Sequence, residues 1–213
     1  MLQIILGNKR YSSWSMRPYL ALAHTGAPFE EQVIPLFEEG YKTRIHEQVP
    51  SGLVPALRDG DRLIWDSLAI CEYLAERFPE AGLWPADDGA RAHARSISCE
   101  MHAGFLALRR EMPMNLHRSR PGQGRTDAAL ADIERVTAIW TDCLQRYGGP
   151  FLFGGFSIAD CMYAPVVTRF LTYCVEVDDA CRGYMDAIMA FPPMIAWHQA
   201  ARAEPWTIAQ YEE

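Results

Sequence analysis

The chain has 213 residues, of which 49% are hydrophobic and 22% charged, ordinary values for a globular protein that exclude disordered, collagen-like and coiled-coil classes. Its 20 basic and 27 acidic side chains give a net charge of -7, so we expect a small-molecule partner rather than a nucleic acid or a membrane surface. The length is large for one typical domain and small for two, which predicts a division or an unusual fold.

Two local features bear on the cellular compartment. The apolar run at residues 1–6 has no basic flank and stops at Gly7, so we expect no signal peptide, and no segment approaches the roughly 20 apolar residues of a membrane-spanning helix. The six cysteines are scattered, without a Cys-x-x-Cys pair or a suitable histidine spacing. We therefore expect a reduced, cytoplasmic protein with neither disulfides nor a metal site.

The first eighty residues alternate short strand and helix patterns. An apolar run predicts a strand over residues 2–6, and helical spacing predicts a helix over residues 16–24 that ends at Gly26. Residues 33–36 form the second predicted strand. A stretch rich in glycine and charge follows up to Val49, with room for a short helix.

A hairpin and a helix are predicted next. Residues 54–57 and 62–65 flank an Asp-Gly pair at 59–60, which is a strong hairpin signal. From Ser67 the apolar side chains recur at helical spacing until Pro79 stops the helix. The predicted order is therefore βαβ followed by ββα.

Beyond residue 89 only helical spacing recurs. It predicts helices over residues 91–111 and 126–147. A further helix is predicted to begin at Ser157, whose hydroxyl can cap the amide of Asp160 while the Asp160 carboxylate returns to the amide of Ser157.

This change of pattern divides the chain. We predict an α/β domain over residues 1–80, a linker rich in proline, glycine and aspartate over residues 81–89, and an all-α domain over residues 90–213. An eighty-residue unit is marginally stable alone, so we expect the two domains to share one interface, with the functional site there.

Serines precede the first predicted helix. Backbone amides and the positive end of that helix can stabilise an anion there, and a hydroxyl can donate to a thiolate and lower the pKa of a thiol. Helix capping alone is the more common explanation for serines in this position. The spacing does not choose among Ser12, Ser13 and Ser15.

Two later pairs of residues suit an extended ligand. A cis peptide at Val54-Pro55 would turn the Val54 backbone groups outward, although most X-Pro bonds are trans. The Ser67 hydroxyl and helix-start amides can hold a carboxylate while Asp66 takes an amino group, or the pair is an ordinary N-cap. One ligand with both groups would satisfy the site.

Four segments together resemble the cytosolic glutathione transferases. They are residues 12–22 (SSWSMRPYLAL), Val54-Pro55, residues 66–70 (DSLAI) and residues 157–160 (SIAD), all in the order of that family. The resemblance implies an α/β thioredoxin-like N-terminal domain followed by an all-α C-terminal domain. It also implies glutathione as co-substrate, no metal, a homodimer and an electrophile bound between the domains.

Within the family, Ser12-Ser13 with Arg17, and the Asn-Leu pair at 115–116, are most similar to the zeta group, which includes maleylacetoacetate isomerases. The resemblance implies that the Ser12 hydroxyl supports the glutathione thiolate, with Ser13 and Arg17 beside it. One position departs from the zeta pattern, because a cysteine is expected where this chain has Trp14. A cysteine in place of Ser12 would instead indicate the thiol exchange of the omega and beta groups.

The resemblance also implies how the rest of glutathione is held. Val54 would pair its backbone with the cysteinyl unit beside a cis-Pro55. Asp66 and Ser67 would hold the γ-glutamyl end. Lys42 falls near a contact to the glycyl carboxylate.

The electrophile needs an apolar pocket facing the thiolate. The candidates are Trp14, Met101, His102, Phe105, Met112 and Asn115. A stripe of methionine and aromatic residues at helical spacing is more often core than pocket. The arginines between residues 109 and 125 fit a solvated loop better than a contact to an anionic substrate.

The predicted function is conjugation of the glutathione thiolate to an electrophilic small molecule, by nucleophilic attack. A first alternative is glutathione-dependent cis-trans isomerisation, in which glutathione adds to the substrate and leaves again. A second is a binding protein that kept the fold without the activity.

Overall fold

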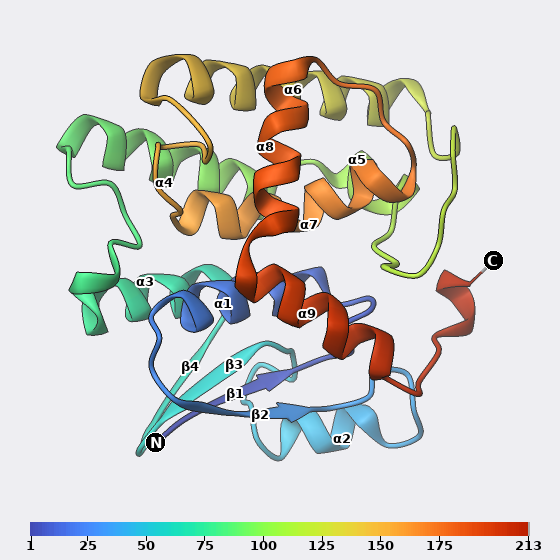
Figure 1. Ribbon diagram of the computed structural model, residues 1–213. Coiled ribbons are helices and arrows are strands. Elements are labelled where there is room, and N and C mark those ends of the chain that lie inside the picture. The colour runs from blue at the N-terminus through green and yellow to red at the C-terminus, as the bar shows by residue number, and fades with distance from the viewer. Residues whose placement is uncertain (213) are drawn as a thin grey trace.

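The computed structural model describes residues 1–212, and its first half is built on a four-stranded sheet (Figure 1). The elements are β1 (Leu2–Leu6), α1 (Ser13–His24), β2 (Phe29–Val33), α2 (Tyr41–His46), β3 (Ala56–Asp59), β4 (Arg62–Trp65) and α3 (Ser67–Arg77). The strand order is β2-β1-β3-β4, with β1 parallel to β2 and antiparallel to β3. The predicted fold class is thereby confirmed for this half.

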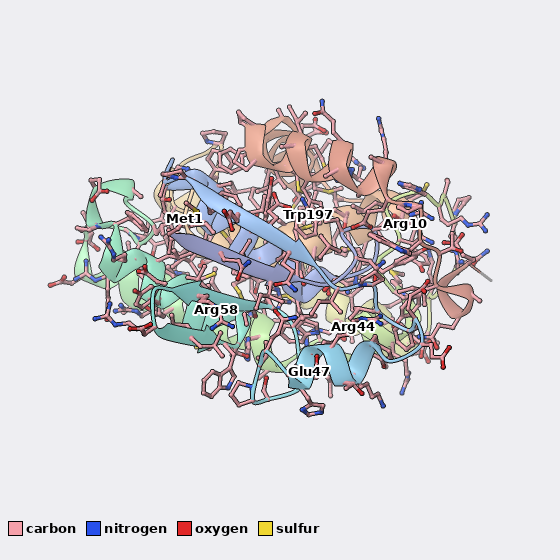
Figure 2. All side chains as sticks on the ribbon, turned by 90° about the horizontal axis from the view of Figure 1, so that it is seen from below. Met1, Arg10, Arg44, Glu47, Arg58 and Trp197 are labelled. Atoms are coloured by element: carbon pink, nitrogen blue, oxygen red, sulfur yellow. The ribbon has the colours of Figure 1, made fainter. Side chains whose placement is uncertain are left out.

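Both faces of the sheet are covered, as the alternation of side chains along β1 requires. Ile4 and Leu6 join the main hydrophobic core with α1 and α3, whereas Ile5 belongs to a smaller core with Ile45 of α2. Seen from below, charged side chains lie on the outer face of α2 and at its C-cap, among them Arg44 and Glu47 (Figure 2). Helix α2 is therefore amphipathic and covers the lower face of the sheet.

The prediction of a second strand over residues 33–36 is wrong, because the strand lies about one strand length earlier in the chain. Strand β2 covers Phe29–Val33 and pairs with β1 from Leu2↔Phe29 to Leu6↔Val33. Its sequence is FEEQV, and its glutamates are exposed because β2 lies at the edge of the sheet. A search for apolar runs misses such a strand, because edge strands carry charged side chains.

The second half is helical. After the short η1 (Pro79–Ala81) come α4 (Asp88–Ala103), α5 (Leu106–Glu111), α6 (Asp127–Tyr147), α7 (Ile158–Thr172), α8 (Asp179–Ala190), α9 (Pro192–Ala203) and η2 (Ala209–Tyr211). Every residue of α7 except Leu171 is buried, and α7 packs against α1 and α4. The helical layer therefore shares one core with the sheet layer (Figure 1).

The single helix predicted over residues 91–111 is wrong, because the chain turns between α4 and α5. Gly104 leaves the helix in an extended conformation, and Phe105 has a left-handed φ of 57°. Phe105 nevertheless stays in the core, so the apolar spacing continues through the break. Spacing alone therefore cannot detect this turn.

The N-terminus of α7 has the expected capping arrangement. The Asp160 carboxylate accepts from the Ser157 amide at 2.8 Å, the Ser157 hydroxyl at 3.0 Å and the Leu152 amide at 3.1 Å. Burial raises the pKa of Asp160 to about 6 in spite of these donors. The prediction that Asp160 returns to the amide of Ser157 is confirmed.

Among residues 1–212, no helix combines the length and the apolar character needed to cross a membrane.

Candidate functional site

Two adjoining hollows lie beside the start of α1, and the larger of them also borders the helical layer. The larger, here called the cleft, has a volume of about 880 Å³ and reaches from Ser12 and Ser13 to Lys42 and to the C-terminal segment. The smaller, here called the side pocket, has a volume of about 350 Å³ and contains Asp66 and Ser67. Trp14 and Val54 line both, so the two hollows are joined.

The side pocket is built on the start of α3. The peptide bond between Val54 and Pro55 is cis, as the resemblance implied, and both residues line the pocket. The Ser67 side chain is 1% exposed, and its hydroxyl has no hydrogen-bond partner within residues 1–212. A buried hydroxyl without a partner at a helix N-terminus suits an incoming carboxylate.

Asp66 performs two tasks in the same pocket. One carboxylate oxygen accepts from the amide of Leu68 at 2.9 Å and so caps α3. The other lies 3.3 Å from the Nε2 atom of His102, which comes from α4. The Asp66 side chain is exposed, so its carboxylate remains accessible to a cationic group of a ligand.

The two serines at the start of α1 differ in their hydrogen bonds, although each is only 8% exposed and each lines the cleft. Ser12 is the N-cap: its oxygen accepts from the Ser15 amide at 3.3 Å, and its hydroxyl donates to the Ser15 oxygen at 2.8 Å. The Ser13 oxygen accepts instead from Nη2 of Arg169, on α7, at 3.2 Å.

Trp14 is surrounded by cationic side chains. The guanidinium groups of Arg17 and Arg109 lie over its ring, 4.3 and 4.7 Å from the centroid, and the His102 ring meets it edge-on at 5.3 Å. Arg17 is 1% exposed, and its Nε and Nη1 atoms have no hydrogen-bond partner in the described part of the chain. Burial, followed by repulsion from Arg109 and Arg169, lowers the pKa of Arg17 to about 9.

The other two guanidinium groups are bonded to neutral partners. Arg109 donates to the carbonyl oxygens of Met101 and His102, and Arg169 to those of Met112 and Pro165. Burial, followed by repulsion from Arg109, lowers the pKa of Arg169 to about 10. Because Arg109 and Arg169 line the cleft, this wall attracts an anion.

The residues proposed from sequence for the apolar pocket lie mostly elsewhere. Met101, Phe105 and Met112 are at most 7% exposed in the core, and none lines the cleft. Asn115 is also buried, and its amide donates to the Tyr211 carbonyl at 2.9 Å. These residues therefore pack the helical layer or hold the C-terminal segment, while apolar contacts in the cleft come from Leu36, Phe37, Pro113, Met114, Ile208 and Tyr211.

The sequence patterns did not identify two parts of the cleft, Arg169 and the C-terminal segment. Arg169 is a buried, charged residue in a helix of mostly apolar residues. Because arginines are rarely buried, its position in the sequence could have marked it as a candidate functional residue. Ile208 and Tyr211 belong to the C-terminal segment, which has no periodicity. Its position depends on Glu212, whose carboxylate accepts from Asn115 and Arg118.

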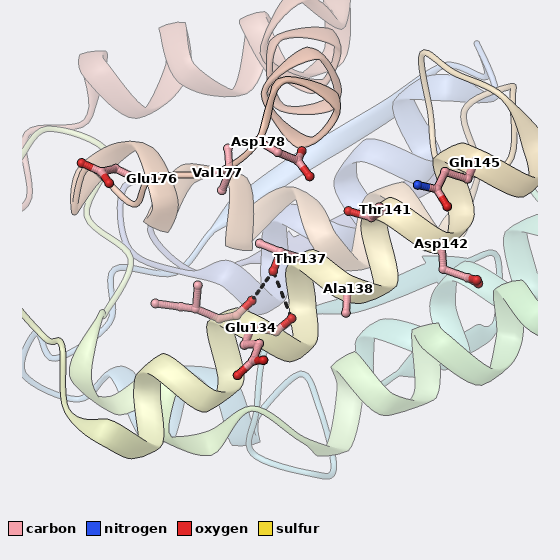
Figure 3. A pocket seen from close by; sticks show the side chains of 10 residues that line it. Glu134, Thr137, Ala138, Thr141, Asp142, Gln145, Glu176, Val177 and Asp178 are labelled. Atoms are coloured by element: carbon pink, nitrogen blue, oxygen red, sulfur yellow. Dashed lines mark hydrogen bonds between the residues drawn. The ribbon is translucent and has the colours of Figure 1, made fainter.

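Two further features lie away from the cleft. His93, Asp142 and Cys143 bring potential ligand atoms within 4.8 Å of one another, but His93 Nδ1 is 3.0 Å from the Tyr147 hydroxyl and Asp142 accepts from Arg146. A shallow hollow beside α6 exposes acidic groups near Thr137 and Thr141 (Figure 3). Neither feature adds a group to the cleft.

Comparisons with known proteins relate both halves of the chain to one family. The family model "Glutathione S-transferase, N-terminal domain" matches residues 11–77, and "Glutathione S-transferase, C-terminal domain" matches residues 123–200. A maleylpyruvate isomerase from Ralstonia sp is 38% identical, covering 87% of this chain and 96% of that protein. A probable maleylacetoacetate isomerase from Caenorhabditis elegans is 32% identical, covering 73% of each chain.

Solved structures show the same fold. A glutathione transferase homolog from Burkholderia with bound glutathione has a TM-score of 0.74 at 22% identity, covering 95% of this chain and 99% of that one. The holo structure of a zeta-class maleyl pyruvate isomerase has a TM-score of 0.73 at 22% identity, covering 97% and 100%.

Proposed function

This chain belongs to the glutathione S-transferase family, and from that premise we propose that it conjugates the glutathione thiolate to an electrophilic small molecule bound in the cleft. The proposal rests on one observation: the cleft and the side pocket are joined and offer different chemical groups. Within residues 1–212, the side pocket holds a buried hydroxyl without a hydrogen-bond partner and an exposed carboxylate. The cleft holds hydroxyls beside Arg109 and Arg169, which donate to carbonyl and hydroxyl oxygens.

Glutathione would lie across both hollows. Its γ-glutamyl carboxylate meets the Ser67 hydroxyl and the start of α3, and its ammonium group meets Asp66. The cysteinyl unit passes Val54, which places the sulfur near the start of α1. The glycyl carboxylate then extends along the cleft toward Lys42, whose ammonium group offers the opposite charge.

The chemistry requires the thiol to lose its proton to solvent. The positive end of α1, its hydroxyl groups and the buried Arg17 guanidinium beside Trp14 all favour the thiolate over the thiol. The sulfur lone pair then forms a bond to the electrophilic carbon. In a substitution the leaving group departs with its bonding electrons, and in an addition the resulting carbanion takes up a proton.

A second candidate, glutathione-dependent isomerisation, is favoured by a specific observation. Arg109 and Arg169 face the cleft with carbonyl and hydroxyl partners, so they remain available for the carboxylates of an anionic substrate. In this reaction the thiolate adds to a cis double bond, rotation follows about the new single bond, and the sulfur leaves as the double bond re-forms. Two of the relatives described above are named as isomerases of maleyl acids.

Following the family resemblance, we also propose that two copies of the chain form a homodimer, which sedimentation velocity would test.

The proposed function is tested by calorimetric titration with glutathione, followed by turnover of two substrates. An activated aryl halide reports conjugation through loss of glutathione, and maleylacetoacetate reports isomerisation without loss of glutathione. Absence of glutathione binding would contradict both candidates. Binding without turnover of either substrate would support the binding-protein alternative.

A further inference from the structure

We infer that Ser13, rather than Ser12, donates the hydrogen bond to the glutathione sulfur, and that Arg169 is the positioning residue that orients Ser13. The inference rests on the proposed glutathione chemistry and names the group that performs its first step. Three observations carry it: the bonding of Ser12, the bonding of Ser13 and the rigidity of Arg169.

Ser12 is occupied by the helix that it caps. Its oxygen accepts from the Ser15 amide at 3.3 Å, and its hydroxyl donates to the Ser15 oxygen at 2.8 Å. The Ser15 oxygen in turn accepts from the Gly7 amide at 2.9 Å, so the group joins α1 to the end of β1. Turning the Ser12 hydroxyl toward a sulfur would break this buried arrangement, which costs free energy.

Ser13 has the opposite arrangement. Its oxygen accepts from Arg169 at 3.2 Å, and within residues 1–212 its own hydroxyl proton is given to no acceptor. The side chain lines the cleft, so that proton is available to a ligand atom there. A hydroxyl that accepts from a cation is polarised and becomes a stronger donor, because hydrogen bonds in series strengthen one another.

Arg169 is held firmly enough to orient Ser13. It is 4% exposed on the buried helix α7, and its Nε and Nη1 atoms donate to the carbonyl oxygens of Met112 at 2.9 Å and Pro165 at 3.2 Å. Only Nη2 reaches across to α1, where it meets Ser13. The helical half of the chain therefore determines the orientation of a hydroxyl on the α/β half.

The test measures the thiol pKa of bound glutathione from the ultraviolet absorbance of its thiolate. Relative to wild type, Ser13→Ala should raise this pKa by about 1, equivalent to a tenfold decrease in the ionisation constant of the bound thiol. Ser12→Ala should leave it nearly unchanged and instead lower the melting temperature through loss of the N-cap. Ser13→Thr keeps a hydroxyl and should restore most of the effect.

The opposite pattern, a raised pKa in Ser12→Ala and a wild-type value in Ser13→Ala, would overturn the inference while leaving the proposed function intact. A wild-type protein that binds glutathione without lowering its thiol pKa would overturn both the inference and the thiolate chemistry. The two failures are therefore distinguishable in one titration series.

The role of Arg169 is tested by a double-mutant cycle. Arg169→Gln should raise the thiol pKa when Ser13 is present and have much less effect in the Ser13→Ala background, because it acts through that hydroxyl. Equal effects in both backgrounds would show a general charge effect and contradict the positioning role. Arg169→Lys preserves the charge but not the directed bond, so it supplies a second test if the glutamine variant fails to fold.

Discussion

The α/β half and the helical half contribute to the cleft in different ways. The α/β half presents backbone features and helix starts: a cis peptide before Pro55, the N-cap Asp66 and the serines that open α1. The helical half presents charged side chains, Arg109 and Arg169, that reach toward those features. Under the proposed function, most groups that hold glutathione would come from the α/β half, whereas the pocket for the electrophile would draw on both halves.

Two contacts join these contributions. Arg169 of α7 donates to Ser13, and His102 of α4 lies beside Asp66. In each pair the α/β residue lines a hollow and the helical residue lies within hydrogen-bonding reach of it. If the two halves contribute to the cleft in these different ways, substitutions in each half should alter different measurable properties of the protein.

The largest expected effect concerns the core of the helical half. Trp140 is fully buried against Tyr163, Phe170 and Tyr184, so Trp140→Ala should lower the free energy of unfolding by about 4 kcal/mol. Glutathione affinity of the folded fraction should stay at the wild-type value, since the core lies outside both hollows. Urea denaturation measures the free energy of unfolding, and calorimetry measures the affinity for glutathione. A loss of affinity together with the loss of stability would contradict the separate roles of the two halves.

The next effect concerns glutathione recognition alone. Ser67→Ala removes the unpartnered hydroxyl and should weaken glutathione binding by about tenfold, as expected for a hydrogen bond to a charged group. Ser98→Ala is the matched control, because Ser98 is also buried and has no hydrogen-bond partner among the described residues, but lies on α4 outside both hollows. Equal dissociation constants for the two variants would exclude Ser67 from the ligand site.

The third effect concerns the electrophile. Arg109→Leu should lower kcat/KM for a dicarboxylate substrate by up to about tenfold, with little change for a neutral aryl halide or for glutathione affinity. Arg135→Leu is the control, since Arg135 pairs with Glu100 away from the cleft. A uniform loss with both substrates would show that Arg109 serves the fold or the thiolate instead.

A smaller effect depends on pH. Burial raises the pKa of Asp160 to about 6 in the folded state, so this carboxyl contributes stability at acid pH that is lost as pH rises through 6. Between pH 7 and pH 5 wild type should therefore gain about 1 kcal/mol relative to Asp160→Asn, which does not titrate. Urea denaturation at both pH values checks this, and a constant difference would contradict the raised pKa.

The smallest effect tests the contact between the halves at His102. Because the Asp66 carboxylate is exposed, His102→Ala should raise the KM for glutathione by only a few-fold, without changing kcat. His102→Gln keeps a donor and should restore the KM. A change in kcat instead of KM would place His102 near the reacting atoms.

Local patterns predicted β1, the hairpin of β3 and β4, α3 and the Asp160 cap, since each depends on neighbours within a few residues. They misplaced β2, whose edge position lets polar side chains form a strand. They also missed the turn at Gly104 and Phe105, where a buried aromatic side chain continues the helical spacing.

By itself the sequence determined the fold class, the family resemblance and the segments from which a glutathione site would be built, because those features are written in short contiguous motifs. Only the tertiary structure decided which side chains complete the cleft. In that structure Met101 and Met112 lie in the core, and Arg169 lies beside Ser13, which is 156 residues away in the chain. The physical reason is that burial and hydrogen-bond partners depend on how helices pack across the two halves, and no local spacing encodes that packing.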